Sequence, residues 1–279
     1  MQPGYKEKFF NAPDGVRLFF RRWFIEEPKG LIGIIHGFAE HSGRYDQLAN
    51  ELCAAGWSVA AFDNRGHGQS GGRRAHIDRF SEYLDDVDSF LDQIGEAGYS
   101  GSPIMLGHSQ GGLIAARFVE RCGDRVAAVV LSSPFLGMAI KVPKLKALAG
   151  KGLSNLIPTL SLKTGLDASC LSHDKKVVED YEADPLVSNI ASARWFTEVL
   201  KAQDLVMRQA ARFNKPLLVM QAGDDKLSSV ECTRRFFESA RVEDKSLKIY
   251  EGYFHEIFNE VERAKVITDL KDWLEQHTK

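Results

Sequence analysis

PIMLGHSQG, residues 103–111, is the stretch of this chain that decides the fold. Its apolar start is typical of a buried strand, and the run that follows it, Gly112–Val119, is typical of a helix. Strand, sharp turn and helix in this order make the pattern G-x-S-x-G the signature of a nucleophile elbow. The serine of an elbow is strained, and the flanking glycines let strand and helix approach closely. Ser109 is therefore the predicted nucleophile.

The rest of the chain alternates short apolar runs with amphipathic ones. Further strands are predicted at 31–35, 58–62, 126–131, 216–221 and 246–250, and an N-terminal hairpin at 5–10 and 16–24. Amphipathic helices separate several of these strands, most clearly over 80–94. The alternation predicts an α/β fold with a mostly parallel sheet and helices on both faces. In such sheets function gathers at the carboxyl ends of the strands, where the motifs of this chain lie.

The stretch 135–205 breaks this alternation. It is rich in Leu, Lys and Ser, contains three prolines and shows no clear strand. We predict that residues 135–205 form a helical cap. The cap is inserted between the two parts of an α/β core, residues 1–134 and 206–279.

Composition and charge restrict the partners of this chain. Its 279 residues carry a formal net charge of −2, from 36 basic and 38 acidic side chains, which argues against nucleic acid as a partner. The N-terminus lacks an apolar signal segment, and no apolar stretch is long enough to span a bilayer. The four cysteines are widely scattered, which favours reduced thiols over a disulfide framework. We therefore expect a cytoplasmic protein.

A serine hydroxyl becomes a nucleophile only with a base within reach and a carboxylate that orients this base. Asp225 follows the predicted strand 216–221, and His255 follows the next one. The order Ser, Asp, His along the chain is that of the α/β-hydrolases. Asp225 is preferred as the acid, with its neighbour Asp224 as the alternative. Three other histidines lie near motifs, but none of them follows the last strand: His36, His67 and His108.

An attacked carbonyl develops an oxyanion, which needs preorganised N–H donors. One donor is expected from the backbone N–H of Gln110, directly after the predicted nucleophile. The second is expected from the loop His36-Gly37-Phe38, which follows the predicted strand 31–35. This chemistry needs neither a cofactor nor a metal ion, and we predict none.

Four motifs together resemble a known family: HGFAEHSGRY at 36–45, DNRGHGQSG at 63–71, GHSQGG at 107–112 and YEGYFHE at 250–256. They are similar to motifs of the monoacylglycerol lipases and related bacterial lysophospholipases, within the α/β-hydrolase superfamily. The resemblance covers most of the chain and is weakest in the predicted cap. It implies an eight-stranded core, a helical cap, and a catalytic set: Ser109, Asp225 and His255, with oxyanion donors at Phe38 and Gln110.

Two residues depart from the pattern of this family. Small residues are usual at the position of Phe38, so its ring is expected to narrow the pocket. Methionine is common at the position of Gln110, whose backbone N–H is unaffected but whose side chain is more polar. These two residues are therefore expected to shape the pocket rather than the chemistry.

The remaining polar residues of the motifs are interpreted as structural. We favour loop and helix-cap structure for four residues of the first motif: Glu40, His41, Arg44 and Tyr45. The alternative is contact between a substrate head group and one of the first two. Arg65 and His67 of the second motif are expected to anchor their loop. Near the C-terminus, Asn259 and Glu262 have the spacing of a capping box that opens a final helix.

Apolar residues recur along the predicted cap with lysines between them. They are Ile140, Val142, Leu145, Leu148, Leu153, Leu156, Ile157 and Leu160, and Lys141, Lys144, Lys146 and Lys151. We favour an apolar face that lines an acyl tunnel, with the lysines in solvent. The alternative is a basic amphipathic lid that makes transient contact with membranes or micelles.

The sequence thus predicts a serine ester hydrolase that cleaves monoacylglycerols or similar monoacyl lipid esters through an acyl-enzyme intermediate. Its partner is then a small-molecule lipid ester, and no oligomeric state is predicted. Alternatives within this class are a lysophospholipase and a carboxylesterase for short or medium chains. A remote alternative is a non-catalytic binding protein of the same fold, although such proteins usually lack part of the triad. Dehalogenases and epoxide hydrolases of this fold use an aspartate nucleophile, and Ser109 argues against both.

Overall fold

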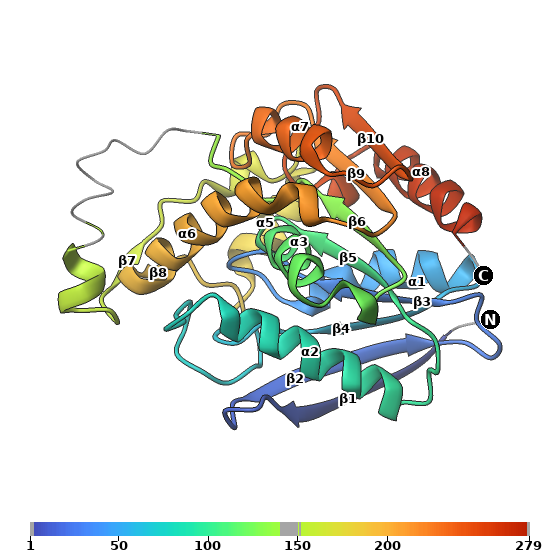
Figure 1. Cartoon of the computed structure of the whole chain (residues 1–279), viewed down its shortest axis with the longest axis horizontal. Helices are drawn as coiled ribbons and strands as arrows, with labels where there is room; N and C mark the ends of the chain where they lie inside the picture. The colour runs from blue at the N-terminus through green and yellow to red at the C-terminus, as the bar shows by residue number, and fades with distance from the viewer. Residues whose placement is uncertain (1–2, 140–149, 151, 278–279) are drawn as a thin grey trace.

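The computed structural model of this chain describes residues 3–139, 150 and 152–277. Its centre is an eight-stranded sheet with the strand order β1-β2-β4-β3-β5-β6-β9-β10 (Figure 1). The strands are β1 (Gly4–Asn11), β2 (Arg17–Phe24), β3 (Leu31–Ile35), β4 (Ser58–Phe62), β5 (Ile104–His108), β6 (Ala128–Ser132), β9 (Leu217–Ala222) and β10 (Lys245–Tyr250). β2 pairs antiparallel with both β1 and β4, and the other neighbours are parallel. The prediction of an eight-stranded, mostly parallel sheet is confirmed.

Helices cover both faces of the sheet (Figure 1). On one face lie α2 (Ser81–Glu96), α3 (Gln110–Cys122), α6 (Ala193–Gln209) and α7 (Val230–Ser239). On the other face lie α1 (Asp46–Ala54) and α8 (Arg263–Gln276). Alternate residues of one strand therefore enter different cores, as Met105 of β5 does against its neighbours Ile104 and Leu106. Because both faces are covered, the central strands β3 to β6 are buried at every position, which explains their unbroken apolar runs.

The end of the chain corrects one expectation. The final helix exists, and its predicted face of Val266, Leu270 and Trp273 is buried. However, α8 begins at Arg263, and no side chain caps its first turn. Asn259 instead ends a 3-10 turn, and its amide donates to Glu256 at 2.8 Å. The predicted capping box is therefore wrong, because Asn259 ends the turn before α8 and does not stand at the N-cap of this helix.

The region predicted as a cap contains strands as well as helices. β7 (Ser161–Lys163) pairs antiparallel with β8 (Ile190–Ser192), so this region contains two short strands that the sequence did not reveal. Three-residue strands are too short for an alternating pattern to reveal them. Helix α5 (Lys175–Ala183) lies between these two strands in the chain. Helix α6 crosses the predicted boundary at 205/206 and packs into the core, so the division into core and cap stays a prediction whose second boundary falls inside a helix.

The apolar residues of the predicted cap are only partly described. The four lysines and the first four apolar residues that the sequence singled out lie outside the described residues. Of the others, Leu153 and Leu160 are half-buried, whereas Leu156 and Ile157 are 83% and 52% exposed. The last two therefore do not line an enclosed tunnel. Across residues 3–139 and 152–277, none of the helices is both long enough and apolar enough to cross a membrane.

Candidate active site

The elbow predicted from the sequence is present. β5 ends at His108, and α3 begins at Gln110. Between them Ser109 has φ 52° and ψ −117°, a conformation that costs a non-glycine residue about 1–3 kcal/mol. Its N–H donates to the carbonyl of Ser132 on β6 at 3.0 Å, which helps to hold the turn. The backbone thus stores strain at the one serine that the motif singled out.

Glycines make this turn possible because backbone atoms of the elbow and of β3 lie close to it. A Cβ atom at Gly111 would lie 2.0 Å from the carbonyl oxygen of Ile35 on β3. A Cβ atom at Gly107 would lie 2.4 Å from the carbonyl oxygen of Gly111. Real Cβ atoms do not approach other atoms so closely, so neither position accepts a side chain without a backbone shift.

Asp225 and His255 meet at the carboxyl end of the sheet. His255 Nδ1 lies 2.8 Å from Asp225 Oδ2, and both side chains are buried. The other carboxylate oxygen accepts the backbone N–H groups of Leu227 at 2.9 Å and Ser228 at 2.8 Å. Asp224 is exposed, and its backbone N–H donates to the carbonyl of Tyr253. The geometry therefore pairs His255 with Asp225 rather than with Asp224.

The charges of His255 and Asp225 shift the pKa of each other. Burial alone would lower the pKa of His255, but the charge of Asp225 and the hydrogen bond to it outweigh burial and raise that pKa above 6.5. Burial would raise the pKa of Asp225, but the charge of His255 and three hydrogen bonds lower it. Asp225 therefore stays ionised at neutral pH and favours a proton on the imidazole.

The three other histidines near the motifs are buried and neutral. Burial lowers the pKa of His36 to about 4 and that of His67 to about 3. His108 has its pKa lowered to about 4, first by burial and then by the charge of His255. Its Nδ1 lies 3.1 Å from the carbonyl oxygen of Ser132, and its ring centroid is 4.9 Å from that of His255. The predicted base therefore stands beside the elbow, and its neighbour does not compete for the proton.

The predicted nucleophile and the predicted base are not hydrogen-bonded to each other in this structure. Ser109 Oγ and His255 Nε2 form no hydrogen bond with any described residue. Catalytic hydrogen bonds are often long in unliganded enzymes and tighten when substrate binds. Within the described ranges, no cluster of three or more His, Cys, Asp or Glu side chains could hold a metal ion.

Two backbone N–H groups lie where oxyanion donors are expected. The N–H of Gln110 opens α3 and has no acceptor within the helix. The N–H of Phe38 makes no backbone hydrogen bond to the described part of the chain. A Cβ atom at Gly37 would lie 3.1 Å from the Cβ of Ser109, so the loop of Phe38 borders the elbow.

Comparison with known proteins agrees with this geometry. Residues 26–262 match the family described as Hydrolase_4, Serine aminopeptidase, S33. This chain belongs to that α/β-hydrolase family. It is 38% identical to phospholipase YtpA of Bacillus subtilis over 91% of this chain and 98% of the relative. It is 35% identical to the monoacylglycerol lipase of Mycolicibacterium smegmatis over 97% of each chain. The crystal structure of Paleococcus ferrophilus monoacylglycerol lipase superposes with a TM-score of 0.84 at 32% identity, covering 98% of this chain and 99% of that one.

Both departures of this hydrolase from its family pattern meet at one residue of α6. The ring of Phe38 lies 4.2 Å from that of Trp195, centroid to centroid. The indole N–H of Trp195 donates to Gln110 Oε1 at 3.1 Å. The Phe38 ring is therefore held against α6. The polar side chain of Gln110 has a partner that methionine would lack.

The signature residues of the first motif build the loop of this hydrolase. Glu40 Oε1 accepts the N–H of Gly37 at 2.6 Å and the hydroxyl of Tyr45 at 2.8 Å. His41 Nδ1 accepts the N–H of Gly43 at 3.1 Å, so its Nε2 carries the proton that points to Asp184 at 2.8 Å. The interpretation of these residues as loop structure is consistent with these contacts.

Arg65 and His67 anchor the second motif. Arg65 pairs with Asp86 of α2 through two nitrogen atoms, at 2.7 and 2.6 Å, and also with Asp14 and Glu82. His67 Nδ1 lies 3.0 Å from the carbonyl oxygen of Arg65. The prediction that these residues hold their loop is confirmed.

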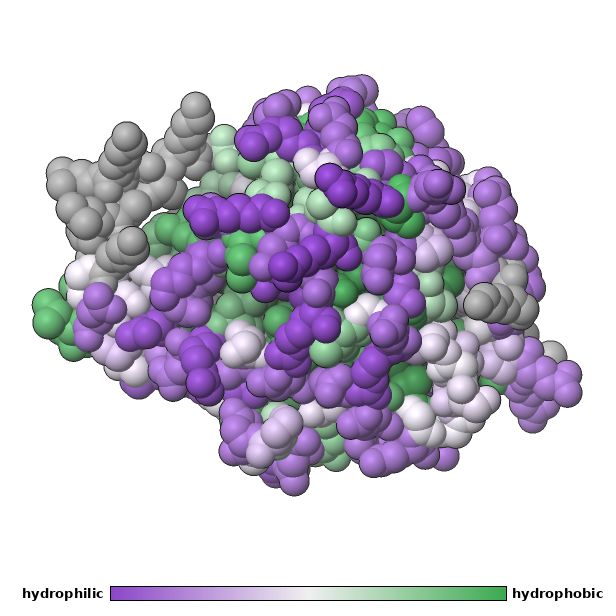
Figure 2. Space-filling view, in the orientation of Figure 1, coloured by the Kyte–Doolittle hydropathy of each residue, from purple (hydrophilic) through white to green (hydrophobic). Residues whose placement is uncertain are grey.

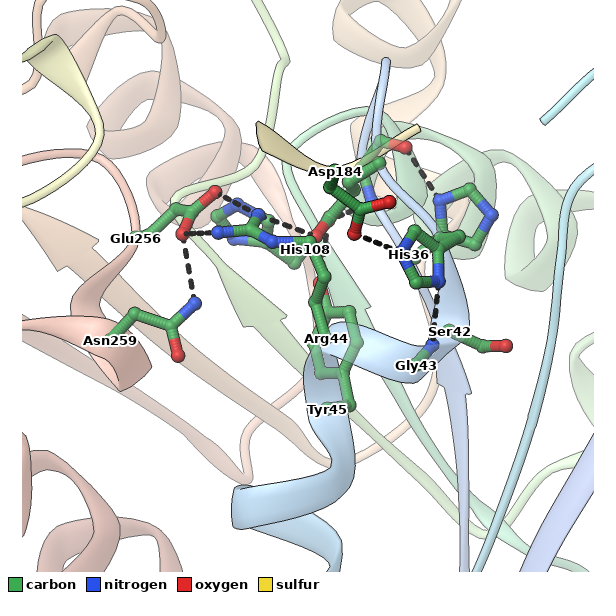
Figure 3. A network of polar contacts seen from close by, with 12 residues as sticks. His36, Ser42, Gly43, Arg44, Tyr45, His108, Asp184, Glu256 and Asn259 are labelled. Carbon is green, nitrogen blue, oxygen red and sulfur yellow. Dashed lines mark hydrogen bonds and ion pairs between the residues drawn. The ribbon is translucent and has the colours of Figure 1, made fainter. Parts of the chain in front are cut away.

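Two functional-site contacts were not foreseen from the sequence. Gln221 donates to Asp225 Oδ2 at 3.0 Å and so helps to orient this carboxylate. Glu256, directly after His255, accepts two hydrogen bonds from Arg44 (Figure 3). Glu256 could have been singled out in the sequence because it directly follows the predicted base. Gln221 lies within a predicted strand, and nothing in the sequence distinguishes it there.

Proposed function

We propose that Ser109, His255 and Asp225 act as nucleophile, base and orienting acid of an ester hydrolase. The observation that carries this proposal is the 2.8 Å contact between His255 Nδ1 and Asp225, beside a strained elbow serine. With Nδ1–H directed to the carboxylate, Nε2 is left to accept the serine proton. The raised pKa of His255 supports its role as a base that takes up and then releases a proton.

The proposed reaction has two halves. Ser109 Oγ forms a bond to the acyl carbon, and its proton passes to His255 Nε2. The bond to the alcohol then breaks, and the alcohol leaves with that proton, so that an acyl-enzyme remains. Water attacks the acyl-enzyme by the same route and releases the fatty acid. In both halves the N–H groups of Phe38 and Gln110 donate to the oxyanion.

The proposed substrate is a monoacylglycerol or a similar monoacyl lipid ester. Support comes from two full-length relatives, from Mycolicibacterium smegmatis and Paleococcus ferrophilus, that are named monoacylglycerol lipases. The aromatic pair of Phe38 and Trp195 beside the elbow supports an apolar acyl group. A second candidate is a lysophospholipid, because the Bacillus subtilis relative is named a phospholipase. The two substrates share the acyl ester and differ in the head group.

A hydrolysis panel tests this proposal. It compares nitrophenyl esters of rising chain length, a monoacylglycerol and a lysophospholipid with the same acyl chain, and an aminoacyl nitroanilide. We expect kcat/KM to be highest for the monoacylglycerol and cleavage of the nitroanilide to be undetectable. A lysophospholipid that exceeds the monoacylglycerol would favour the second candidate. Cleavage of the nitroanilide alone would overturn the ester-hydrolase proposal.

We further propose that the cap makes transient contact with membranes or micelles. Leu156, Ile157 and Leu162 are 83%, 52% and 55% exposed. Figure 2 shows a hydrophobic spot at the left edge of the molecule, where Figure 1 draws the segment before β7. Large apolar side chains held in water support contact with the aggregate that carries a lipid substrate.

A further inference from the structure

Arg44 joins two loops of the candidate active site. Its Nη1 and Nη2 donate to the two carboxylate oxygens of Glu256, at 2.5 and 2.8 Å (Figure 3). The same Nη1 donates to Glu40 Oε2 at 3.1 Å. One guanidinium therefore holds a carboxylate from the loop after β3 and another from the loop after β10.

The Glu40 end of this bridge controls the proposed oxyanion donor. Glu40 Oε1 accepts the N–H of Gly37 at 2.6 Å, and Gly37 directly precedes Phe38. A shift of the Glu40 carboxylate would therefore change the direction of the Phe38 N–H. Hydrogen-bond donors to an oxyanion act only when they are held in the correct geometry beforehand.

The Glu256 end controls the proposed base. Glu256 directly follows His255, its N–H donates to the carbonyl of Leu171 at 2.8 Å, and Asn259 donates to its carboxylate at 2.8 Å. The loop of His255 is thus fixed by Asp225 on one side and by Arg44 on the other.

The bridge of Arg44 with Glu40 and Glu256 is buried, and this burial indicates what the bridge contributes. The side chains of Arg44, Glu40 and Glu256 are 11%, 4% and 5% exposed. Buried ion pairs are weak sources of stability, because removing charges from water costs about as much as their attraction returns. A bidentate guanidinium–carboxylate contact does fix the distance and the angle between the two side chains. Geometry, rather than stability, is what this bridge supplies.

The charges of the bridge also act on the base. Burial would lower the pKa of Arg44, but Glu256 and Glu40 raise it, and the pKa of Glu256 is lowered to about 2, chiefly by Arg44 against burial. Arg44 and Glu256 therefore stay ionised as a pair. The titratable and charged groups around His255 are Asp225, Glu256, Glu40, Arg44 and His108.

We propose that Arg44 is a positioning residue, which fixes the loop of the oxyanion donor relative to the loop of the base through Glu40 and Glu256. This inference rests on the proposed function, because it requires Ser109 and His255 to be the reacting pair.

Two variants separate geometry from charge. Arg44→Lys keeps the charge and loses the bidentate contact, so kcat for a short nitrophenyl ester should fall about 10- to 100-fold. Its KM should stay within about 3-fold and the acid limb of its pH profile should not move, because binding and charge are retained. Glu256→Gln keeps the shape and removes a carboxylate that favours protonated His255. The acid limb of its kcat/KM profile should therefore move to lower pH.

Arg117→Lys is the matched control. The Arg117 side chain is 12% exposed, lies on α3 and pairs with Glu120, whose side chain is 1% exposed. Arg117 also donates to Gln209 of α6 at 2.8 Å. This variant loses a comparable buried contact away from both loops, so it should keep kcat and the pH profile. Urea unfolding of each variant establishes the folded fraction at which the rates are compared.

Labelling by a fluorophosphonate distinguishes the two possible failures. If the folded wild type does not label at Ser109, the proposed function and this inference both fall. If the wild type labels, and Arg44→Lys labels and turns over at the wild-type rate, only this inference is overturned. It is also overturned if Arg117→Lys loses as much kcat as Arg44→Lys, since general destabilisation would then explain both. A loss confined to Arg44→Lys, with a shifted acid limb in Glu256→Gln, supports it.

Discussion

The elbow and the predicted cap are held in different ways. At the elbow, backbone approaches backbone: a side chain at Gly111 would overlap the carbonyl of Ile35. Within the predicted cap, α6 packs into the core, whereas the segment before it meets the core at polar links such as His41 with Asp184 at 2.8 Å and the N–H of Ser188 with the carbonyl of Ala39 at 3.1 Å. Around these links the cap leaves large apolar side chains in water. A rigid elbow suits chemistry that tolerates little displacement, whereas a segment joined at a few points, with exposed apolar side chains, suits the selection and entry of substrate.

The largest expected effect is on folding at the elbow. In Gly111→Ala the added Cβ would lie 2.0 Å from one backbone oxygen and 2.6 Å from another, so β3 and α3 must separate. We expect the free energy of unfolding to fall by at least about 4 kcal/mol, measured by urea denaturation. The control is Gly152→Ala in the cap, where a Cβ meets nothing within 4 Å and the change should stay within about 0.5 kcal/mol. Equal midpoints for the two variants would remove the contrast between elbow and cap.

The next effect separates two neighbouring acids. Asp225→Asn should lower kcat about 10⁴-fold, because an amide no longer holds the histidine in the required tautomer. Asp224→Asn should stay within about 3-fold of the wild type, because the Asp224 side chain is exposed. Steady-state kinetics on one ester measure both. If Asp224→Asn lost more kcat than Asp225→Asn, the assignment of Asp225 as the acid would be wrong.

The pH profile gives a smaller effect. Only neutral His255 can accept the serine proton, and its pKa is raised above 6.5. The kcat/KM should therefore fall as the pH drops through that raised value, about tenfold for each pH unit below it. Fluorescence at each pH is the control for unfolding, because protonation of buried His36, His67 and His108 disfavours the fold at low pH. A profile that stays flat from pH 8 to pH 5 in folded protein would remove histidine as the base.

The smallest effect on stability is expected in the cap. Leu156→Ser is predicted to change the free energy of unfolding by less than about 0.5 kcal/mol, because the side chain is 83% exposed. Its rate on a soluble short ester should match the wild type, whereas hydrolysis of a monoacylglycerol in micelles should fall several-fold. Equal rates of variant and wild type on micelles would remove the proposed role of this surface.

The elbow could be predicted from the sequence, and much of the cap could not. Central strands buried on both faces read as unbroken apolar runs, and the glycines at 107 and 111 are required by contacts that any elbow makes. The strands β7 and β8 contain three residues each, and their pairing joins segments 31 residues apart from Ser161 to Ser192. Strands this short leave no alternating pattern in the local sequence, and their pairing partner is too distant to be recognised there.

The bridge across the site escaped prediction for the same reason. Arg44 and Glu256 lie 212 positions apart, and each alone is typical of a solvated loop charge. They come into contact only because the folded sheet places the carboxyl ends of β3 and β10 on the same side of the molecule. The capping box failed in the opposite sense: the local pattern is present, but α8 begins only at Arg263, beyond the position that Asn259 would have to cap.

The central claim is that Ser109 on the elbow is the nucleophile, and replacing it by alanine tests this claim most directly. In Ser109→Ala, kcat for a nitrophenyl ester should fall by about four to six orders of magnitude, with an unchanged urea midpoint and no fluorophosphonate labelling. The wild type, measured beside it, should label once per chain. A folded Ser109→Ala protein that hydrolyses the ester within about tenfold of the wild-type rate would contradict the account.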